Sequence, residues 1–207
     1  MTKIKICGIT NKIDALAAAE LGVDMLGFVF YAKSKRYVEP KVAEDIINEM
    51  PPSIRKVGVF VDEGRDTVLK IAQDTLLDTL QFHGDEAPEY CASFKGKYKV
   101  IKAFRLKDKN DLKKINDYDA DFFLFDTYKS DSIGGTGETF DWKILKDFEI
   151  LKPVILSGGL NPKNIGLAIK EVAPFGVDVA TGVEESPGKK SLELMKKFVE
   201  NVRKIDL

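Results

Sequence analysis

Residues 4–30, IKICGITNKIDALAAAELGVDMLGFVF, hold the pattern from which the fold can be predicted. Two continuous apolar runs, at 4–9 and 25–30, flank an alanine-rich segment at 13–21. Continuous apolar runs are typical of parallel strands that are covered on both faces, whereas alanine favours a helix. Gly22 follows as a helix-ending residue. The stretch therefore predicts one strand–helix–strand unit.

The same alternation recurs along the whole chain. Eight short apolar runs lie at 4–9, 25–30, 57–61, 79–82, 100–104, 122–125, 154–156 and 177–180. Segments of helical character follow them, at 13–21, 42–50, 65–73, from Pro88, around Leu112 and Ile115, and at 142–145, 165–172 and 192–202. Alternating strands and helices predict a parallel sheet with right-handed crossovers. Eight such units close a (β/α)₈ TIM barrel, an α/β fold whose lower size limit lies near 207 residues.

An open doubly wound sheet is the alternative arrangement. That fold usually has fewer strands and a glycine-rich first turn, and no G-x-G-x-x-G follows the first run. The barrel is therefore favoured. No linker or low-complexity tract divides the chain, so we expect a single domain over 1–207. The stretch KKSLELMKK at 189–197 is expected to be the solvated face of a final helix.

Composition excludes several classes of protein. The chain has 32 Lys+Arg and 33 Asp+Glu, a net charge of −1, so neither a nucleic-acid nor a membrane-surface partner is expected. Two cysteines and one histidine leave little room for a disulfide framework or a zinc cluster, and no metal is expected. No apolar run approaches the ~18 residues of a membrane span, and the first ten residues contain no apolar stretch of signal-peptide length, so neither feature is expected. The default expectation is a soluble, cytoplasmic protein.

Two reactive side chains stand at strand ends, where barrels of this kind form their active sites. Cys7 lies where the first run gives way to Gly8; it could serve as a base or nucleophile beside a cation, or be a small buried hydrophobe. Asp126 ends the run FFLFD and would be partly desolvated, which suits a general acid; capping a helix is the alternative. Since they belong to strands one and six, we expect them to face each other across the barrel mouth. Such an acid and base suit a cofactor-free isomerase.

Two glycine-bearing segments suit an anion. Gly158 and Gly159 follow the seventh run, and Thr181 and Gly182 follow the eighth, which also carries Asp178. The loops after strands seven and eight are the usual phosphate site of this fold, because backbone N–H groups and a helix start meet there.

Other residues near strand ends allow a functional and a structural interpretation. Arg36, in the basic loop at 33–37, could grip a carboxylate with two hydrogen bonds or be solvated. His83 lies in QFHG (81–84), near the end of the fourth run, and could be an acid–base group, although a hydrogen-bonded pocket wall is favoured. Cys91 is expected to be a packing residue. The glycines at 134–137 are expected to form a mobile lid or loop, with a second phosphate site as the less favoured alternative.

Seven segments together carry a family resemblance that runs the length of the chain. They are KICGIT (5–10), GFVFYAKSKRYV (27–38), VGVFV (57–61), QFHG (81–84), FDT (125–127) with GGTGETFDW (134–142), LSGGLNPKN (156–164) and GVDVATGVEESPGKK (176–190). In this order they resemble the phosphoribosylanthranilate isomerase family.

The resemblance implies an isomerase of tryptophan biosynthesis with no cofactor. Its reaction is the Amadori rearrangement of N-(5′-phosphoribosyl)anthranilate to 1-(2-carboxyphenylamino)-1-deoxyribulose 5-phosphate. By the same resemblance Cys7 would be the general base, Asp126 the general acid, and Arg36 the ligand of the anthranilate carboxylate. The remaining substrate-binding residues would be His83, Asp178, Gly158, Gly159, Thr181 and Gly182.

Two other functions remain open from the sequence. One is another phosphosugar aldose–ketose isomerase or epimerase on the same barrel, such as the aminoaldose isomerase of histidine biosynthesis; that family has aspartate where Cys7 stands. The other is a non-catalytic protein that retains the phosphate loops, which Cys7 and Asp126 argue against. The expected partner is a phosphorylated small molecule, and the chain is expected to be a monomer or homodimer.

Overall fold

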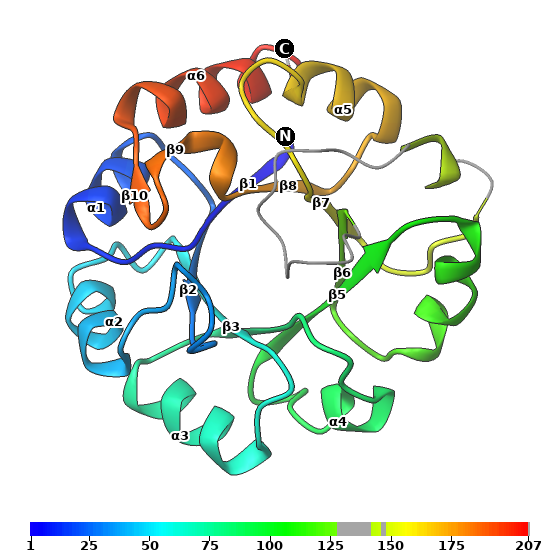
Figure 1. Ribbon diagram of the computed structural model, residues 1–207, viewed down its shortest axis with the longest axis horizontal. Helices are drawn as coiled ribbons and strands as arrows, with labels where there is room; N and C mark the ends of the chain where they lie inside the picture. The colour runs from blue at the N-terminus through cyan, green and yellow to red at the C-terminus, as the bar shows by residue number, and fades with distance from the viewer. Residues whose placement is uncertain (128–141, 146–147, 207) are drawn as a thin grey trace.

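Eight parallel strands form a closed barrel in the computed structural model, which describes residues 1–127, 142–145 and 148–206. The strands are β1 (Lys3–Cys7), β2 (Met25–Val29), β3 (Arg55–Phe60), β4 (Thr79–Phe82), β5 (Lys99–Leu106), β6 (Phe122–Thr127), β7 (Val154–Leu156) and β8 (Gly176–Val179). Each strand pairs with the next, and β8 pairs back with β1. Figure 1 shows this ring of strands inside a ring of helices. The predicted (β/α)₈ TIM barrel is confirmed, whereas the expected lid or loop at 134–137 lies outside the described residues.

Helices follow the strands as predicted. The α-helices are α1 (Lys12–Glu20), α2 (Pro40–Ile47), α3 (Arg65–Asp74), α4 (Pro88–Ala92), α5 (Ile165–Val172) and α6 (Leu192–Arg203). The segments η1 (Lys109–Asp117) and η2 (Trp142–Leu145) are 3₁₀-helices. In η1 the sequence KNDLKKIND is rich in Asn and Asp, which favour caps and turns over an α-helix interior.

Side chains alternate across each strand, so that apolar residues facing the helices are separated from apolar residues facing the barrel interior. Ile4 and Ile6 pack outward in the large core that the strands share with the helices. A smaller cluster fills the barrel interior and consists of Met25, Val57, Ile101, Ala103, Leu124 and Ile155. Cys7 belongs to a third cluster, with Val29 and Val59. The inward-facing apolar layers form the floor below the strand ends.

One element near the C-terminus was not predicted. The segments β9 (Glu184–Ser186) and β10 (Lys189–Lys190) form an antiparallel hairpin after the 3₁₀-helix η3 (Thr181–Val183). The expectation that 189–197 is a solvated helix face is wrong at Lys190, which is 3 % exposed. The ammonium of Lys190 donates to the carbonyl oxygen of Cys7 at 2.6 Å, so the hairpin is fastened to the end of β1.

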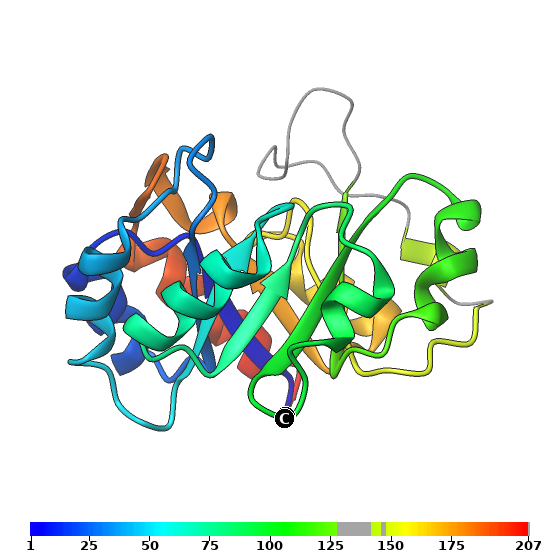
Figure 2. The ribbon, with the colours of Figure 1, turned by 90° about the horizontal axis from the view of Figure 1, so that it is seen from below.

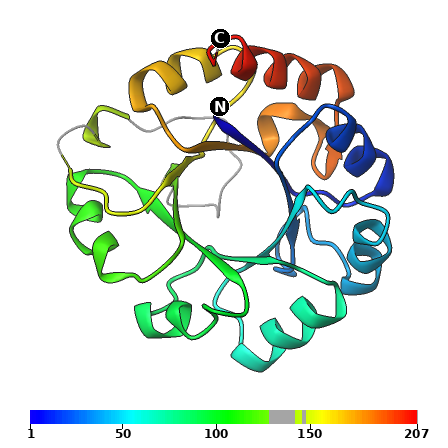
Figure 3. The ribbon, with the colours of Figure 1, turned by 180° about the vertical axis from the view of Figure 1, so that it is seen from behind.

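The two rims of the barrel differ. Figure 2 shows the loop after β2 and the β9–β10 hairpin rising from one rim, while the C-terminus lies at the other. Seen from behind in Figure 3, the two chain ends lie close together, and the backbone N–H of Thr2 donates to Asp206 at 2.9 Å. Within the described part of the chain, every helix is too short or too polar to span a bilayer.

Candidate active site

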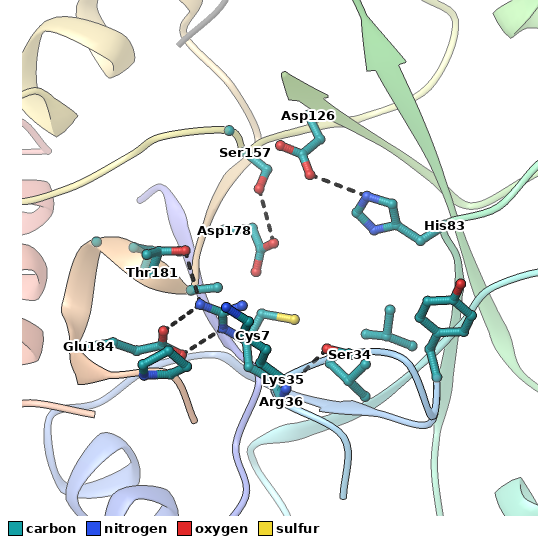
Figure 4. A pocket seen from close by; sticks show the side chains of 18 of the residues that line it. Cys7, Ser34, Lys35, Arg36, His83, Asp126, Ser157, Asp178, Thr181 and Glu184 are labelled. Atoms are coloured by element: carbon teal, nitrogen blue, oxygen red, sulfur yellow. Dashed lines mark hydrogen bonds and ion pairs between the residues drawn. The ribbon is translucent and has the colours of Figure 1, made fainter. Parts of the chain in front are cut away.

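A cavity of about 880 Å³ opens at the C-terminal ends of the barrel strands. Its lining includes all nine site residues expected from the sequence, namely Cys7, Arg36, His83, Asp126, Gly158, Gly159, Asp178, Thr181 and Gly182. Figure 4 shows ten of the lining side chains with labels. Among the described residues, no group of three or more His, Cys, Asp or Glu side chains is arranged to hold a metal ion.

Glycines on both sides of Cys7 make room for its neighbours. Gly27 on β2 is the register partner of Cys7, and a Cβ atom there would lie 2.7 Å from the Cys7 sulfur. Gly8 has a φ of +77°, and a Cβ atom on it would lie 2.8 Å from Cδ of Arg36. Glycine at position 8 therefore permits the close approach of the Arg36 side chain.

A buried lysine, which the sequence interpretation missed, lies beside Cys7. Lys5 is 0 % exposed, and its Nζ lies 2.8 Å from Oδ1 of Asp178. Burial raises the pKa of the Cys7 thiol, and the positive charge of Lys5 opposes this rise. The available signal was the strand pattern of KIKIC, in which residues two apart point to the same side.

Asp178 connects the strands at the back of the cavity. Its Oδ1 accepts from Lys5, and its Oδ2 accepts from the Ser157 hydroxyl at 3.2 Å. The residue is almost fully buried and still lines the cavity. Both carboxylate oxygens therefore have protein partners.

Asp126 is in contact with the single histidine of the chain. His83 Nε2 lies 3.2 Å from Asp126 Oδ2 (Figure 4). The side-chain amide nitrogen of Gln81 lies 2.9 Å from His83 Nδ1; with the amide in this orientation it donates to Nδ1, and the proton of a neutral His83 ring is then on Nε2. The other Asp126 oxygen accepts from the backbone N–H of Thr127 at 2.7 Å.

Cys7 and Asp126 reach the cavity from β1 and β6, between which β7 and β8 lie in the ring. In Figure 4 their side chains enter the same space from different sides, with Asp178 between them in this view. A substrate bound in this space would contact a thiol and a carboxyl group at once.

Arg36 is held by a partner that the sequence did not suggest. Its Nε donates to Oε1 of Glu184 at 2.8 Å, its Nη2 donates to Oε2 at 2.6 Å, and Nη2 also reaches the hydroxyl of Thr181 at 3.3 Å. Lys190 donates to the same Glu184 carboxylate at 2.8 Å. Burial would raise the pKa of Glu184, but Arg36 and Lys190 hold it below its ordinary value. One edge of the guanidinium is therefore engaged within the protein, and Nη1 has no partner among the described residues.

The glycine segments after β7 and β8 pack tightly against each other. Gly158 and Gly159 have positive φ angles of 84° and 65°, and no described residue accepts a hydrogen bond from their N–H groups. A Cβ atom on Gly182 would collide with the carbonyl oxygen of Leu160. Glycine at these positions leaves unpaired N–H donors beside the cavity, an arrangement suited to an oxyanion.

Comparison with known proteins agrees with this geometry. The family model described as N-(5′-phosphoribosyl)anthranilate (PRA) isomerase matches residues 4–201. A curated relative from Thermoanaerobacter sp. (strain X514), named N-(5′-phosphoribosyl)anthranilate isomerase, is 49 % identical over 205 residues, which are 99 % of this chain and 100 % of the relative.

Solved structures give the same result. The phosphoribosyl anthranilate isomerase of Thermotoga maritima is 41 % identical, with a TM-score of 0.90 over 99 % of this chain and 100 % of that one. A second structure, of the isomerase in complex with reduced 1-(o-carboxyphenylamino)-1-deoxyribulose 5-phosphate, is 40 % identical with a TM-score of 0.88, over 99 % and 100 % of the two chains. The chain therefore belongs to the N-(5′-phosphoribosyl)anthranilate isomerase family.

Proposed function

We propose that the cavity converts N-(5′-phosphoribosyl)anthranilate to 1-(2-carboxyphenylamino)-1-deoxyribulose 5-phosphate, an intramolecular step of tryptophan biosynthesis. The observation that carries the proposal is the entry of Cys7 and Asp126 into one cavity from β1 and β6. Membership of the isomerase family supports it, as does the solved relative that holds a reduced form of this product.

Asp126 is assigned as the general acid. Its carboxyl proton goes to the furanose ring oxygen, the bond from C1′ to that oxygen breaks, and the anthranilate nitrogen shares its lone pair with C1′ to form an iminium ion. The resulting Asp126 carboxylate lies 3.2 Å from His83 Nε2, whose ring proton can stabilise the new negative charge. His83 thereby assists the proton donor.

Cys7 is assigned as the general base. Its thiolate removes the proton from C2′, and the released electron pair forms the C1′–C2′ double bond while the iminium nitrogen becomes neutral. The enolamine then tautomerises to the ketone by gaining a proton at C1′ and losing one from the C2′ hydroxyl. Because the iminium acidifies the C2′ hydrogen, a thiolate of moderate basicity is sufficient.

Arg36 and the glycine segments are assigned to the two ends of the substrate. The guanidinium atom Nη1, which Glu184 does not use, can donate to the anthranilate carboxylate. The N–H groups of Gly158 and Gly159, with the η3 residues Thr181 and Gly182, can bind the phosphate. That assignment leaves Asp178 facing the middle of the substrate. The single-domain organisation, the monomeric or homodimeric state, the cytoplasmic location and the lack of a nucleic-acid partner stay predictions.

A fluorescence assay tests the proposal. Freshly generated phosphoribosylanthranilate loses its anthranilate-type fluorescence when it is isomerised, so adding the enzyme should accelerate the decay and adding Cys7→Ser should not. A decay no faster than the spontaneous one would exclude this substrate and leave another phosphosugar isomerase or epimerase as the function.

A further inference from the structure

The mechanism above does not use the ammonium of Lys5, which is fully buried. Lys5 lies on β1 beside Met25 of β2 and Asp178 of β8 in the strand registers, with a side chain that is 0 % exposed. Met25 belongs to the apolar layer inside the barrel. Burying an ammonium next to an apolar layer costs desolvation free energy unless the group is paired and hydrogen-bonded. The partners of Lys5 therefore indicate its role.

Lys5 lies beside two polar side chains. One N–H donates to Oδ1 of Asp178 at 2.8 Å. Cys7 is two residues further along β1, so its side chain points to the same side of the strand as that of Lys5. Gly27 leaves the space in which both meet, because a Cβ atom there would lie 2.7 Å from the sulfur and 3.1 Å from Nζ of Lys5.

We propose that Lys5 is a positioning residue for Cys7: its ammonium, anchored by Asp178, stabilises the thiolate that removes the C2′ proton. The role assigned to the thiolate rests on the proposed function, whereas the stabilisation itself does not. A purely structural role would require only the Lys5–Asp178 pair, whereas the ammonium also lies beside the Cys7 sulfur in the space that Gly27 leaves open.

The charges around Cys7 come from three elements. Lys5 on β1 and Lys190 on β10 favour the thiolate, and Asp178 on β8 disfavours it. Burial alone would lower the pKa of Lys5, but Asp178 and Cys7 raise it above its ordinary value, so Lys5 stays charged. Lys190 points its ammonium at the backbone oxygen of Cys7 at 2.6 Å, whereas the ammonium of Lys5 lies on the side of the Cys7 sulfur.

Thiol alkylation tests the inference without substrate. The chain has two cysteines, and burial raises the pKa of Cys91 to about 12, so a Cys91→Ala parent isolates Cys7. The rate of iodoacetamide alkylation is measured by mass spectrometry from pH 6 to pH 10 in this parent and with Lys5→Met added. We expect the midpoint of the pH profile to rise by about one unit or more, and the rate at pH 7 to fall about tenfold.

Two further variants complete the test. Lys102→Met removes another buried lysine, whose ammonium pairs with Glu86 at 2.8 Å on the outer side of the barrel, and it should leave the midpoint unchanged. Lys5→Gln keeps a donor for Asp178 but not the charge, and it serves if Lys5→Met fails to fold. A folded Lys5 variant with an unchanged midpoint overturns the inference. Failure of the proposed function would appear separately, as a decay of phosphoribosylanthranilate fluorescence no faster than the spontaneous one when the parent enzyme is added.

Discussion

The carboxylate of Glu184 holds the guanidinium of Arg36 through two hydrogen bonds, at 2.8 Å from Nε and 2.6 Å from Nη2. Lys190 joins the same carboxylate and also donates to the carbonyl oxygen of Cys7. The β9–β10 hairpin thus connects the arginine of the β2 loop to the end of β1. The arrangement fixes one edge of the guanidinium before any ligand arrives.

Arg36→Ala should raise the KM about 10- to 100-fold with a smaller effect on kcat, because it removes a charge-assisted contact to the anthranilate carboxylate. Steady-state kinetics by the fluorescence assay provide the measurement, with the exposed Lys41→Ala on α2 as control. An unchanged KM would remove the assignment of Arg36.

Glu184→Gln should raise the KM several-fold, since a neutral amide holds the guanidinium less firmly. In an Arg36→Ala background the same change should have no further effect on KM. This double-mutant cycle separates positioning of Arg36 from any direct contact of Glu184 with substrate, and additive effects would contradict the positioning role.

Cys7→Ser should keep substrate affinity and lower kcat by about 10²–10⁴, because a hydroxyl is too weak a base for the C2′ proton. Single-turnover kinetics and a binding titration measure the two quantities separately. Near parental turnover would show that another group takes the proton.

Asp126→Asn should lower kcat by a similar factor of about 10²–10⁴, because an amide cannot donate the acid proton. The carboxamide still fits beside His83 and the N–H of Thr127, so the fold should be retained. A circular dichroism melt checks the fold. Substantial turnover in a folded variant would show that another group donates the proton to the ring oxygen.

The stability contributed by Glu184 should depend on pH. Its folded pKa lies below the ordinary value of 4.5, so the ionised group stabilises the fold fully above about pH 4.5 and loses this contribution as the pH falls through the folded pKa. The difference in unfolding free energy between the parent and Glu184→Gln should therefore shrink on acidification. Urea titrations at pH 7 and at pH 3 measure it, and a difference that grows at low pH would reverse the sign assigned here.

The strand order and the strand-end residues were predictable because they depend on patterns within short stretches of sequence. Continuous apolar runs identified the eight strands with errors of at most two residues at their ends; for example, the run at 25–30 became Met25–Val29. Alternation along a strand and the rule that parallel strands end at one rim then brought Cys7, Asp126 and Asp178 to a single cavity. The chemistry of these positions was readable from the sequence for the same reason.

The contacts of the charged residues depended on tertiary structure. Lys5 meets Asp178 across 173 positions, and Lys190 meets the carbonyl of Cys7 across 183. Arg36 and Glu184 are 148 positions apart. A lysine in KIKIC or in GKK is locally indistinguishable from a solvated one, because burial follows from which distant carboxylate or carbonyl the closed barrel brings to it. The sequence alone determined the barrel and its row of strand-end residues; barrel closure alone decided which charges are buried, and so how Cys7 and Arg36 are held.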